Sequence, residues 1–565
     1  MWKVILKTQI PSYLSRLVAL MALSMLTLPF SGLAQFEFTT NNGTITITGY
    51  TGPGGDVTIP SSTNGLPVTT IGVYAFYGQT ALVGVRIPDS VTIIGSDAFL
   101  GCSYLASTTI GNSVTNIGVE AFYGCALTNV EIGNSVTSIG ASAFMGCLHL
   151  TSVVIPDSVV SIGSQAFQGC SSLTNVAVGK SVTSIGAFAF HDCSRLTNIA
   201  VDAANPHYAS GGGVLFNKTL TTLIQCPEGM TGSYAVPGKV TNIGQDAFYN
   251  CSSLTNIMIP NNVTRIGDDA FMECDDLISA TIGNGVTNIG NSAFEDCFSL
   301  ASVTIPDSAT SIGGQAFFAS GLASVTISSS VTSISNGTFA YCSGLTNVMI
   351  PNSVTSIGDE AFMACYDLLN ITIGNSTTYI GNTAFEDCGL LNVTIPDSVT
   401  SIGGKAFYGC FSLTNVTIGN SATNIGIYAF SLCTLLHQAY FEGNAPRVNG
   451  GTGSADSTVF PVEFGTVYYV PGTTGWDATF GGWPTAQWYQ PRPQLLGSGN
   501  GLGVQGNRFH FTISWATNTA VVVEASTNLQ NWTPVVTNSL VNGTNAFWDS
   551  NWTNYPQRFY RVHSQ

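Results

Sequence analysis

The chain has 565 residues, of which 44% are hydrophobic and only 8% are charged, and its formal net charge is −16 at pH 7. This length suffices for several domains and a large buried surface. Such an acidic chain is repelled by phosphate backbones and by anionic lipids, which argues against nucleic acid as a partner.

Residues 1–34 have the layout of a secretory signal peptide. Three basic residues precede an apolar run at Leu17–Phe30, and Gly32 and Ala34 place small residues at −3 and −1 of a cleavage site. The alternative is a membrane anchor, but the run is shorter than the ~20 residues of a membrane span. Cleavage after Ala34 leaves 12 basic and 31 acidic side chains, a net charge of −19. We predict a secreted or cell-surface protein without a transmembrane anchor after cleavage.

Residues 35–63 precede the first repeat. The segment 36–60 alternates apolar and polar residues, which predicts a pair of edge strands. Because a solenoid needs covers at both ends, we assign this segment as the N-terminal β cap.

A long internal repeat follows. The Phe of an Ala-Phe pair (Thr-Phe at 339) recurs every 22 or 23 residues, apart from one step of 58 residues, at positions 76, 99, 122, 144, 167, 190, 248, 271, 294, 317, 339, 362, 385, 407 and 430. A fixed period of this length is typical of a solenoid, in which each repeat buries its apolar face by stacking on its neighbours.

Each repeat reads L-x-N-V-x-I, then P-D-S or G-N-S, then V-T-x-I-G-x-x-A-F-x-x-C. In residues 413–418 the alternation predicts a short strand with Val416 and Ile418 inward, and with Asn415 and Thr417 outward. The Pro or Gly turns the chain, and the V-T-x-I segment packs a second inner edge. The Ala-Phe segment fits one turn of helix.

Acidic pairs precede some Ala-Phe segments, as at Asp268-Asp269 and Asp359-Glu360. Because carboxylates stabilise a helix N-terminus, we interpret them as caps of the helical turn. The alternative is a calcium site, but the compact D-x-D-x-D-G loop is absent. We predict no metal and no cofactor.

Thirteen of the fourteen cysteines stand three residues after a repeat Phe. An exported protein usually suggests disulfides. Here each cysteine occupies one slot per coil, and the Phe317 repeat has Ser320 in that slot. A slot that accepts serine favours free, buried thiols over bridges.

The phrase I-P-x-S-V-T-x-I-G-x-x-A-F-x-x-C-x-x-L resembles the BspA-like leucine-rich repeat family, from about Asn64 to Leu436. The resemblance assigns residues 64–441 to a right-handed leucine-rich-repeat-like solenoid with a parallel β-sheet on its concave face and short helical turns. It also implies an exported or surface bacterial protein involved in adhesion and in host or matrix binding. A fold alone does not fix a function.

The expanded repeat occupies residues 201–240. Two apolar segments flank Asn217-Lys218, which predicts a β-hairpin, and Cys226 stands outside the register of the other cysteines. The segment either bends the solenoid or presents His207 and Tyr208 as a functional loop.

The repeat phrase ends near Phe441, and the composition of the sequence changes there. Aromatic residues in 442–490 predict a C-terminal cap, and residues 491–506 form a Pro/Gly linker. The G-x-G-x-x-G match in this linker is not a dinucleotide site, because no strand precedes it and no helix follows it.

Residues 507–565 predict a small all-β module with strands near 508–515, 519–525, 532–537, 544–548 and 557–563. The module resembles a C-terminal module of exported Verrucomicrobia proteins, often built like a fibronectin-type sandwich. We assign its tryptophans, Trp515, Trp532, Trp548 and Trp552, to the sandwich core rather than to a sugar-binding stripe.

No catalytic constellation is present in the sequence. The six histidines, at 149, 191, 207, 437, 510 and 563, are scattered, and neither H-E-x-x-H nor G-x-S-x-G occurs. We predict that the protein is not an enzyme.

The candidate binding surface is the outward face of the predicted concave sheet. Its candidate residues are Arg86, Glu131, Asn175, Asn256, Met258, Asn347, Met349, Asn415 and Thr417. Small polar residues suit a broad contact with a protein or glycan partner. The predicted function is therefore a non-enzymatic interaction or adhesion protein, with a carbohydrate- or ice-binding protein as the alternative and a hydrolytic enzyme as the third possibility; the oligomeric state stays open.

Overall fold

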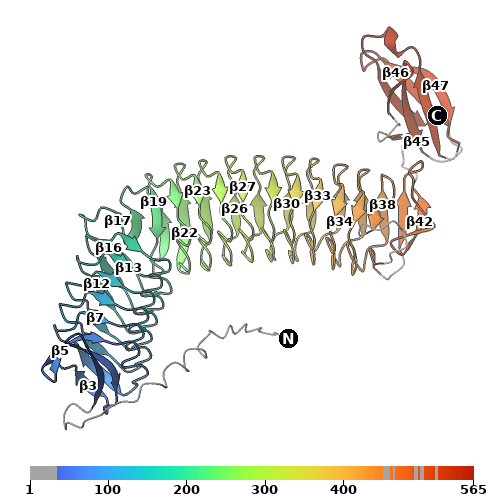
Figure 1. The fold of residues 1–565 in the computed structure, drawn as a ribbon. Helices are drawn as coiled ribbons and strands as arrows, with labels where there is room; N and C mark the ends of the chain where they lie inside the picture. The colour runs from blue at the N-terminus through green and yellow to red at the C-terminus, as the bar shows by residue number, and fades with distance from the viewer. Residues whose placement is uncertain are drawn as a thin grey trace.

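The computed structural model describes residues 35–448, 458–461, 465–488, 494–496, 502–515, 520–541 and 543–564. The predicted signal peptide lies outside the described residues, as do parts of the predicted C-terminal cap and linker. The chain winds into a β-solenoid of about 18 turns with parallel sheets, followed by a smaller all-β module (Figure 1). The predicted solenoid is confirmed.

Each coil has three sides, which residues 392–410 illustrate. The long-strand side is Asn392–Ile395, the short-strand side is Ser401–Ile402, and the Phe side is the turn around Phe407. Strands on the first two sides pair in parallel with equivalent residues one coil away; Asn392 pairs with Asn415, for example. Stacked coils therefore place each repeat position in a column.

The long-strand side consists of the even-numbered strands β6 (Leu82–Arg86), β8 (Ser107–Thr109), β10 (Asn129–Glu131), β12 (Ser152–Ile155), β14 (Asn175–Val178), β16 (Asn198–Val201), β22 (Leu254–Ile259), β24 (Ser279–Ile282), β26 (Ser302–Thr304), β28 (Ser324–Thr326), β30 (Asn347–Met349), β32 (Asn370–Thr372), β34 (Asn392–Ile395), β36 (Asn415–Ile418) and β38 (Gln438–Phe441). The short-strand side consists of the odd-numbered strands β7 (Ile93–Ile94), β9 (Asn116–Ile117), β11 (Ser138–Ile139), β13 (Ser161–Ile162), β15 (Ser184–Ile185), β21 (Asn242–Ile243), β23 (Arg265–Ile266), β25 (Asn288–Ile289), β27 (Ser311–Ile312), β29 (Ser333–Ile334), β31 (Ser356–Ile357), β33 (Tyr379–Ile380), β35 (Ser401–Ile402), β37 (Asn424–Ile425) and β39 (Arg447–Val448).

The Phe side contains no helix in the described coils, so the predicted helical turn is wrong. The residues two before and two after each repeat Phe have positive φ; around Phe362 they are Glu360 (φ 59°) and Ala364 (φ 58°). A left-handed residue at both ends of the turn prevents a right-handed helix from continuing. The coils are still joined here, because the Phe362 N–H donates to the Ala384 carbonyl at 2.8 Å.

The acidic pairs therefore do not cap helices, which corrects that interpretation. The first member of each pair joins two coils: the Asp268 carboxylate accepts a hydrogen bond of 2.8 Å from the Asn291 N–H. Asp359 accepts the equivalent bond from Asn382, also at 2.8 Å. The second member, such as Glu360, occupies the left-handed position.

The core is a stack of apolar columns, and its largest column is phenylalanine. Phe362 is fully buried and stacks on Phe339 at 5.2 Å and on Phe385 at 5.3 Å between ring centroids, so its ring points into the core. The glycine after the short strand allows coils to approach closely. A Cβ at Gly381 would stand 2.5 Å from the carbonyl group of Gly358.

The thirteen cysteines of the repeat slot are free and buried, as predicted, and Cys226 is free and buried as well. In the regular coils each thiol donates to the carbonyl of the Phe in the preceding coil; Cys388 contacts the Phe362 oxygen at 3.1 Å. Ser320 keeps a version of this contact, because its hydroxyl donates to the Phe317 carbonyl of its own coil at 2.7 Å. The slot therefore selects a small donor.

The N-terminal end is covered by strands outside the repeat. An antiparallel pair, β1 (Phe36–Asn41) and β2 (Thr44–Tyr50), joins the short-strand side through β5 (Leu66–Ile71), against which β4 (Ser62–Thr63) also pairs. On the long-strand side, β3 (Gly55–Thr58) pairs with β6.

The expanded repeat forms β17 (Tyr208–Gly211), β18 (Val214–Asn217), β19 (Thr222–Gln225) and β20 (Gly232–Ala235). The antiparallel pairing of β18 with β19 confirms the predicted hairpin, and β17 adds a strand that the sequence did not reveal. His207 is exposed, but Tyr208 is half-buried and its hydroxyl accepts the Ile185 N–H at 3.1 Å. The loop therefore does not present both residues.

The buried core divides into two clusters at this repeat, and the solenoid changes direction near β17 and β19 (Figure 1). The Phe column is interrupted between Phe190 and Phe248. Cys226 occupies the missing Phe register, because its N–H donates to the Ala247 carbonyl at 2.7 Å, as Phe248 does to Ala270. We call the expanded repeat, residues 201–240, the joint.

The C-terminal end adds β40 (Thr466–Tyr469), β41 (Thr479–Phe480) and β42 (Trp483–Gln487), with β40 and β42 extending the long-strand side. The module contains β43 (Gln494–Leu496), β44 (Leu502–Gln505), β45 (Arg508–Ser514), β46 (Ala520–Ser526), β47 (Thr533–Ser539), β48 (Thr544–Asp549), a short 3-10 turn η2 (Trp552–Asn554) and β49 (Phe559–Ser564). The five predicted strands lie within two residues of β45–β49.

The module core is built around Phe511, Ile513 and Phe547, and Trp515 packs against it. The other three predicted core tryptophans lie outside this core. Trp548, 38% exposed, has the Arg508 guanidinium over its ring at 4.9 Å. The assignment of all four tryptophans to the core is therefore wrong for three of them, namely Trp532, Trp548 and Trp552.

Candidate functional site

The nine candidate residues all lie at outward positions of the long-strand side. Five are exposed, namely Arg86, Glu131, Met258, Asn347 and Met349, and four are half-buried, namely Asn175, Asn256, Asn415 and Thr417. The two apolar members, Met258 and Met349, are 59% and 72% exposed. The structure spreads these residues over nearly the whole solenoid and does not gather them into one site.

The asparagines among them contact polar side chains at the same position of neighbouring coils. The Asn370 amide donates to Asn347 at 2.9 Å, and the Asn415 amide donates to the Asn392 oxygen at 2.8 Å. Such a column uses one donor and one acceptor of each amide to hold neighbouring strands in register. The asparagine column is therefore first a structural feature of the sheet.

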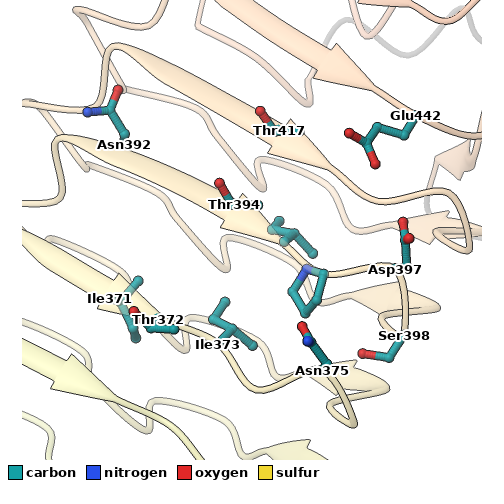
Figure 2. A pocket seen from close by; sticks show the side chains of 12 residues that line it. Ile371, Thr372, Ile373, Asn375, Asn392, Thr394, Asp397, Ser398, Thr417 and Glu442 are labelled. Carbon is teal, nitrogen blue, oxygen red and sulfur yellow. The ribbon is translucent and has the colours of Figure 1, made fainter. Parts of the chain in front are cut away.

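A depression lies near the C-terminal end of this side, with a volume of about 680 Å³ (Figure 2). Its lining residues are Ile371, Thr372, Ile373, Asn375, Asn392, Thr394, Ile395, Pro396, Asp397, Ser398, Thr417 and Glu442. Thr417 is the candidate residue that the sequence placed here; the others were missed. Ile371 and Pro396 are half-buried and add apolar surface among hydroxyl, amide and carboxylate groups, whereas Ile373 and Ile395 are buried beneath it.

Two carboxylates stand at one end of the depression (Figure 2). Burial raises the pKa of Glu442, and the nearby Asp397 carboxylate raises it further. Asp397 accepts the Asn420 N–H at 2.8 Å, whereas the Glu442 carboxylate makes no polar contact with the described residues. No lysine or arginine lines the depression, so its potential is negative.

The sequence carried a signal for this site that was overlooked. Where neighbouring coils read N-V-T-I-P or N-V-T-I-G, the coil of β38 reads Q-A-Y-F-E. Glu442 thus replaces the turn Pro or Gly, and Tyr440 replaces the outward Thr. Tyr440 then begins an aromatic cluster: its ring stacks on Tyr468 at 5.2 Å and meets Trp488 at 4.7 Å. All three rings are half-buried.

The threonine columns of the two strand sides differ in what their hydroxyls do. On the short-strand side Thr378 and Thr400 donate to carbonyls of the preceding coil, at 3.0 and 3.1 Å. On the long-strand side the hydroxyls of Thr394 and Thr417 make no hydrogen bond with the described residues. Hydroxyls able to bind a ligand thus face outward in the depression.

The described ranges hold no group of three or more His, Cys, Asp or Glu side chains that could bind a metal ion. Burial raises the pKa of Cys102 to about 12 and keeps this thiol protonated. Within the same ranges, no helix is long and apolar enough to cross a membrane.

The family model for the BspA-type leucine-rich repeat region, in six copies, matches residues 69–197, 137–235, 230–346 and 355–451. The chain is similar to a leucine-rich cell surface protein from Faecalibacterium prausnitzii A2-165, with 31% identity over 62% of this chain and 95% of that one, at a TM-score of 0.46. It is also similar to a leucine-rich repeat protein from Bacteroides ovatus ATCC 8483, with 27% identity over 72% and 92% of the two chains, at a TM-score of 0.45. No curated protein matches it. Since the family model covers more than half of the chain, the protein belongs to the BspA-type leucine-rich repeat family.

Proposed function

We propose that the protein is an exported, non-enzymatic interaction protein that presents the long-strand side of its solenoid to a protein or glycan partner. The observation that carries this proposal is the regular outward face of that side, which is sparsely charged and has exposed apolar members such as Met258 and Met349. Broad surfaces that combine apolar and neutral polar groups suit recognition of an extended partner.

Two further observations support the proposal. The family model matches repeats found in surface proteins, and one similar protein is described as a leucine-rich cell surface protein. A solenoid also repeats its backbone along one dimension, so an extended partner meets the same strand spacing at each step.

The test uses the chain without residues 1–34, labelled and applied to arrays of extracellular matrix proteins and of glycans. We expect saturable binding to one class, and Met349→Arg should weaken that binding at least tenfold by placing a charge on the long-strand side. Tyr379→Arg, on the short-strand side of a neighbouring coil, is the matched control and should leave binding unchanged. Equal loss in both variants, or no saturable binding at all, contradicts the proposal.

A further inference from the structure

The depression on the long-strand side continues directly into the aromatic cluster. Parallel pairing places Thr394, Thr417, Tyr440 and Tyr468 opposite one another on consecutive strands β34, β36, β38 and β40. Neighbouring strands lie ~4.8 Å apart, so the column offers one outward group per step of that length. A pyranose ring in an extended chain has a length close to this strand spacing.

The groups in the column match the two faces of a sugar. Hydroxyl oxygens of Thr394 and Thr417, and the unpartnered carboxylate of Glu442, can exchange hydrogen bonds with sugar hydroxyls. The half-buried ring of Pro396 can contact the C–H groups between those hydroxyls.

The aromatic cluster adds a second element of sugar recognition. The negative face of an aromatic ring attracts the C–H hydrogens of an apolar sugar face. Tyr440, Tyr468 and Trp488 are all half-buried, so part of each ring remains open at the end of the depression.

The charges decide which sugars fit. Asp397 and Glu442 face the depression and no basic side chain lines it, so sulfated or uronic-acid polymers are repelled. We propose that the depression, together with Tyr440, Tyr468 and Trp488, is a binding site for an extended, uncharged polysaccharide. This inference rests on the proposed function and names its partner class.

The test is calorimetric titration of the chain without residues 1–34 with four probes: a β-1,4-linked glucose hexamer, a β-1,4-linked N-acetylglucosamine hexamer, a heparin hexasaccharide and hexalysine. We expect binding of at least one uncharged hexamer and none of the heparin fragment. Glu442→Gln should weaken the binding about tenfold, because a hydrogen bond to a charged acceptor becomes a weaker bond to a neutral one. Thr417→Val should weaken it about fivefold.

Matched controls carry the same substitutions away from the depression. Glu37→Gln on β1 and Thr304→Val on β26 replace exposed residues and should change affinity less than twofold. Unchanged circular dichroism melts verify that Glu442→Gln and Thr417→Val fold. A loss of affinity in the controls equal to that in the test variants contradicts the inference.

Two outcomes separate this inference from the proposed function. If hexalysine binds and the uncharged hexamers do not, the site serves a basic peptide and the polysaccharide assignment is wrong. If array binding is sensitive to Met349→Arg but no hexamer binds, the proposed function stands and the inference is wrong. If neither assay detects binding, both are wrong.

Discussion

The backbone N–H of Asp192 donates a hydrogen bond of 2.6 Å to the carboxylate of Glu228. Asp192 belongs to the last coil before the joint. In a regular coil the N–H at this position donates to a backbone carbonyl of the next coil, as Gly101 does to Tyr123. The second carboxylate oxygen of Glu228 is buried without a hydrogen-bond partner. The Glu228 side chain therefore replaces the backbone carbonyl that a regular coil would provide on the Phe side.

The first prediction concerns pH. Burial raises the pKa of Glu228 to about 8 from 4.5. The folded chain holds this proton while the unfolded chain releases it, so stability is full below pH 4.5 and falls until about pH 8. Glu228→Gln should remove this loss, on the order of a few kcal/mol, and make the variant more stable than the native chain at pH 8.5.

Another group opposes this trend at lower pH. Burial lowers the pKa of His191 to about 4 from 6.5, so its contribution is present above pH 6.5 and is lost as the pH falls toward 4. The net effect of Glu228 is therefore clearest between pH 6.5 and 8. Denaturant unfolding at these two pH values gives the free energy of unfolding at each. An equal change of this free energy with pH in the native chain and in Glu228→Gln contradicts the prediction.

The second prediction compares two phenylalanines. Phe362→Ala should cost about 3–5 kcal/mol and broaden the thermal transition, because one coil loses its stacked ring and can fray alone. Phe298→Ala removes an equal side chain that is 59% exposed and should cost less than about 0.5 kcal/mol. Calorimetric melts decide; similar losses in the two variants contradict the column model.

The third prediction concerns the thiols. Only the thiolate reacts with iodoacetamide, and burial both shields the cysteines and raises the pKa of thiols such as Cys388. Mass spectrometry should find no adduct on the folded chain and fourteen adducts in guanidinium without reductant. Bridges between cysteines of neighbouring coils would overturn this expectation.

The fourth prediction tests the left-handed turns. Leu432 is exposed and has a φ of 59°, which costs a residue with a Cβ about 1–2 kcal/mol. Leu432→Gly should therefore raise the free energy of unfolding by about 0.5–1 kcal/mol after the larger backbone entropy of glycine is counted. Ser431→Gly, at the preceding position, should lower it by a similar amount. Destabilisation by both variants would refute the explanation.

The periodic features of the fold were predictable because each has a fixed residue type. Phe362 and Cys388 stand in columns that the sequence displays directly, and stacking converts a period into burial. The left-handed positions were not predictable. Glu360, Lys405 and Tyr428 all occupy the same one, so the position has no residue signature.

The candidate site was predicted as a face but not as a depression. Outward positions such as Thr417 follow from alternation along one strand. The approach of Glu442 to Asp397 depends instead on the register between two coils, and on the replacement of a turn Pro or Gly by glutamate. The glutamate at 442, where other coils have Pro or Gly, was the feature of the sequence that could have indicated the depression.

Methionine oxidation tests the central claim, that the long-strand side binds the partner. Met349 lies on that side, opposite Thr372 at the edge of the depression, and Met363 lies on the Phe side of the same coil. Peroxide treatment of the free and partner-bound chain, followed by peptide mass spectrometry, gives an oxidation rate for each. The account predicts slower oxidation of Met349 and an unchanged rate at Met363 in the complex; protection of Met363 with Met349 still freely oxidised would contradict it.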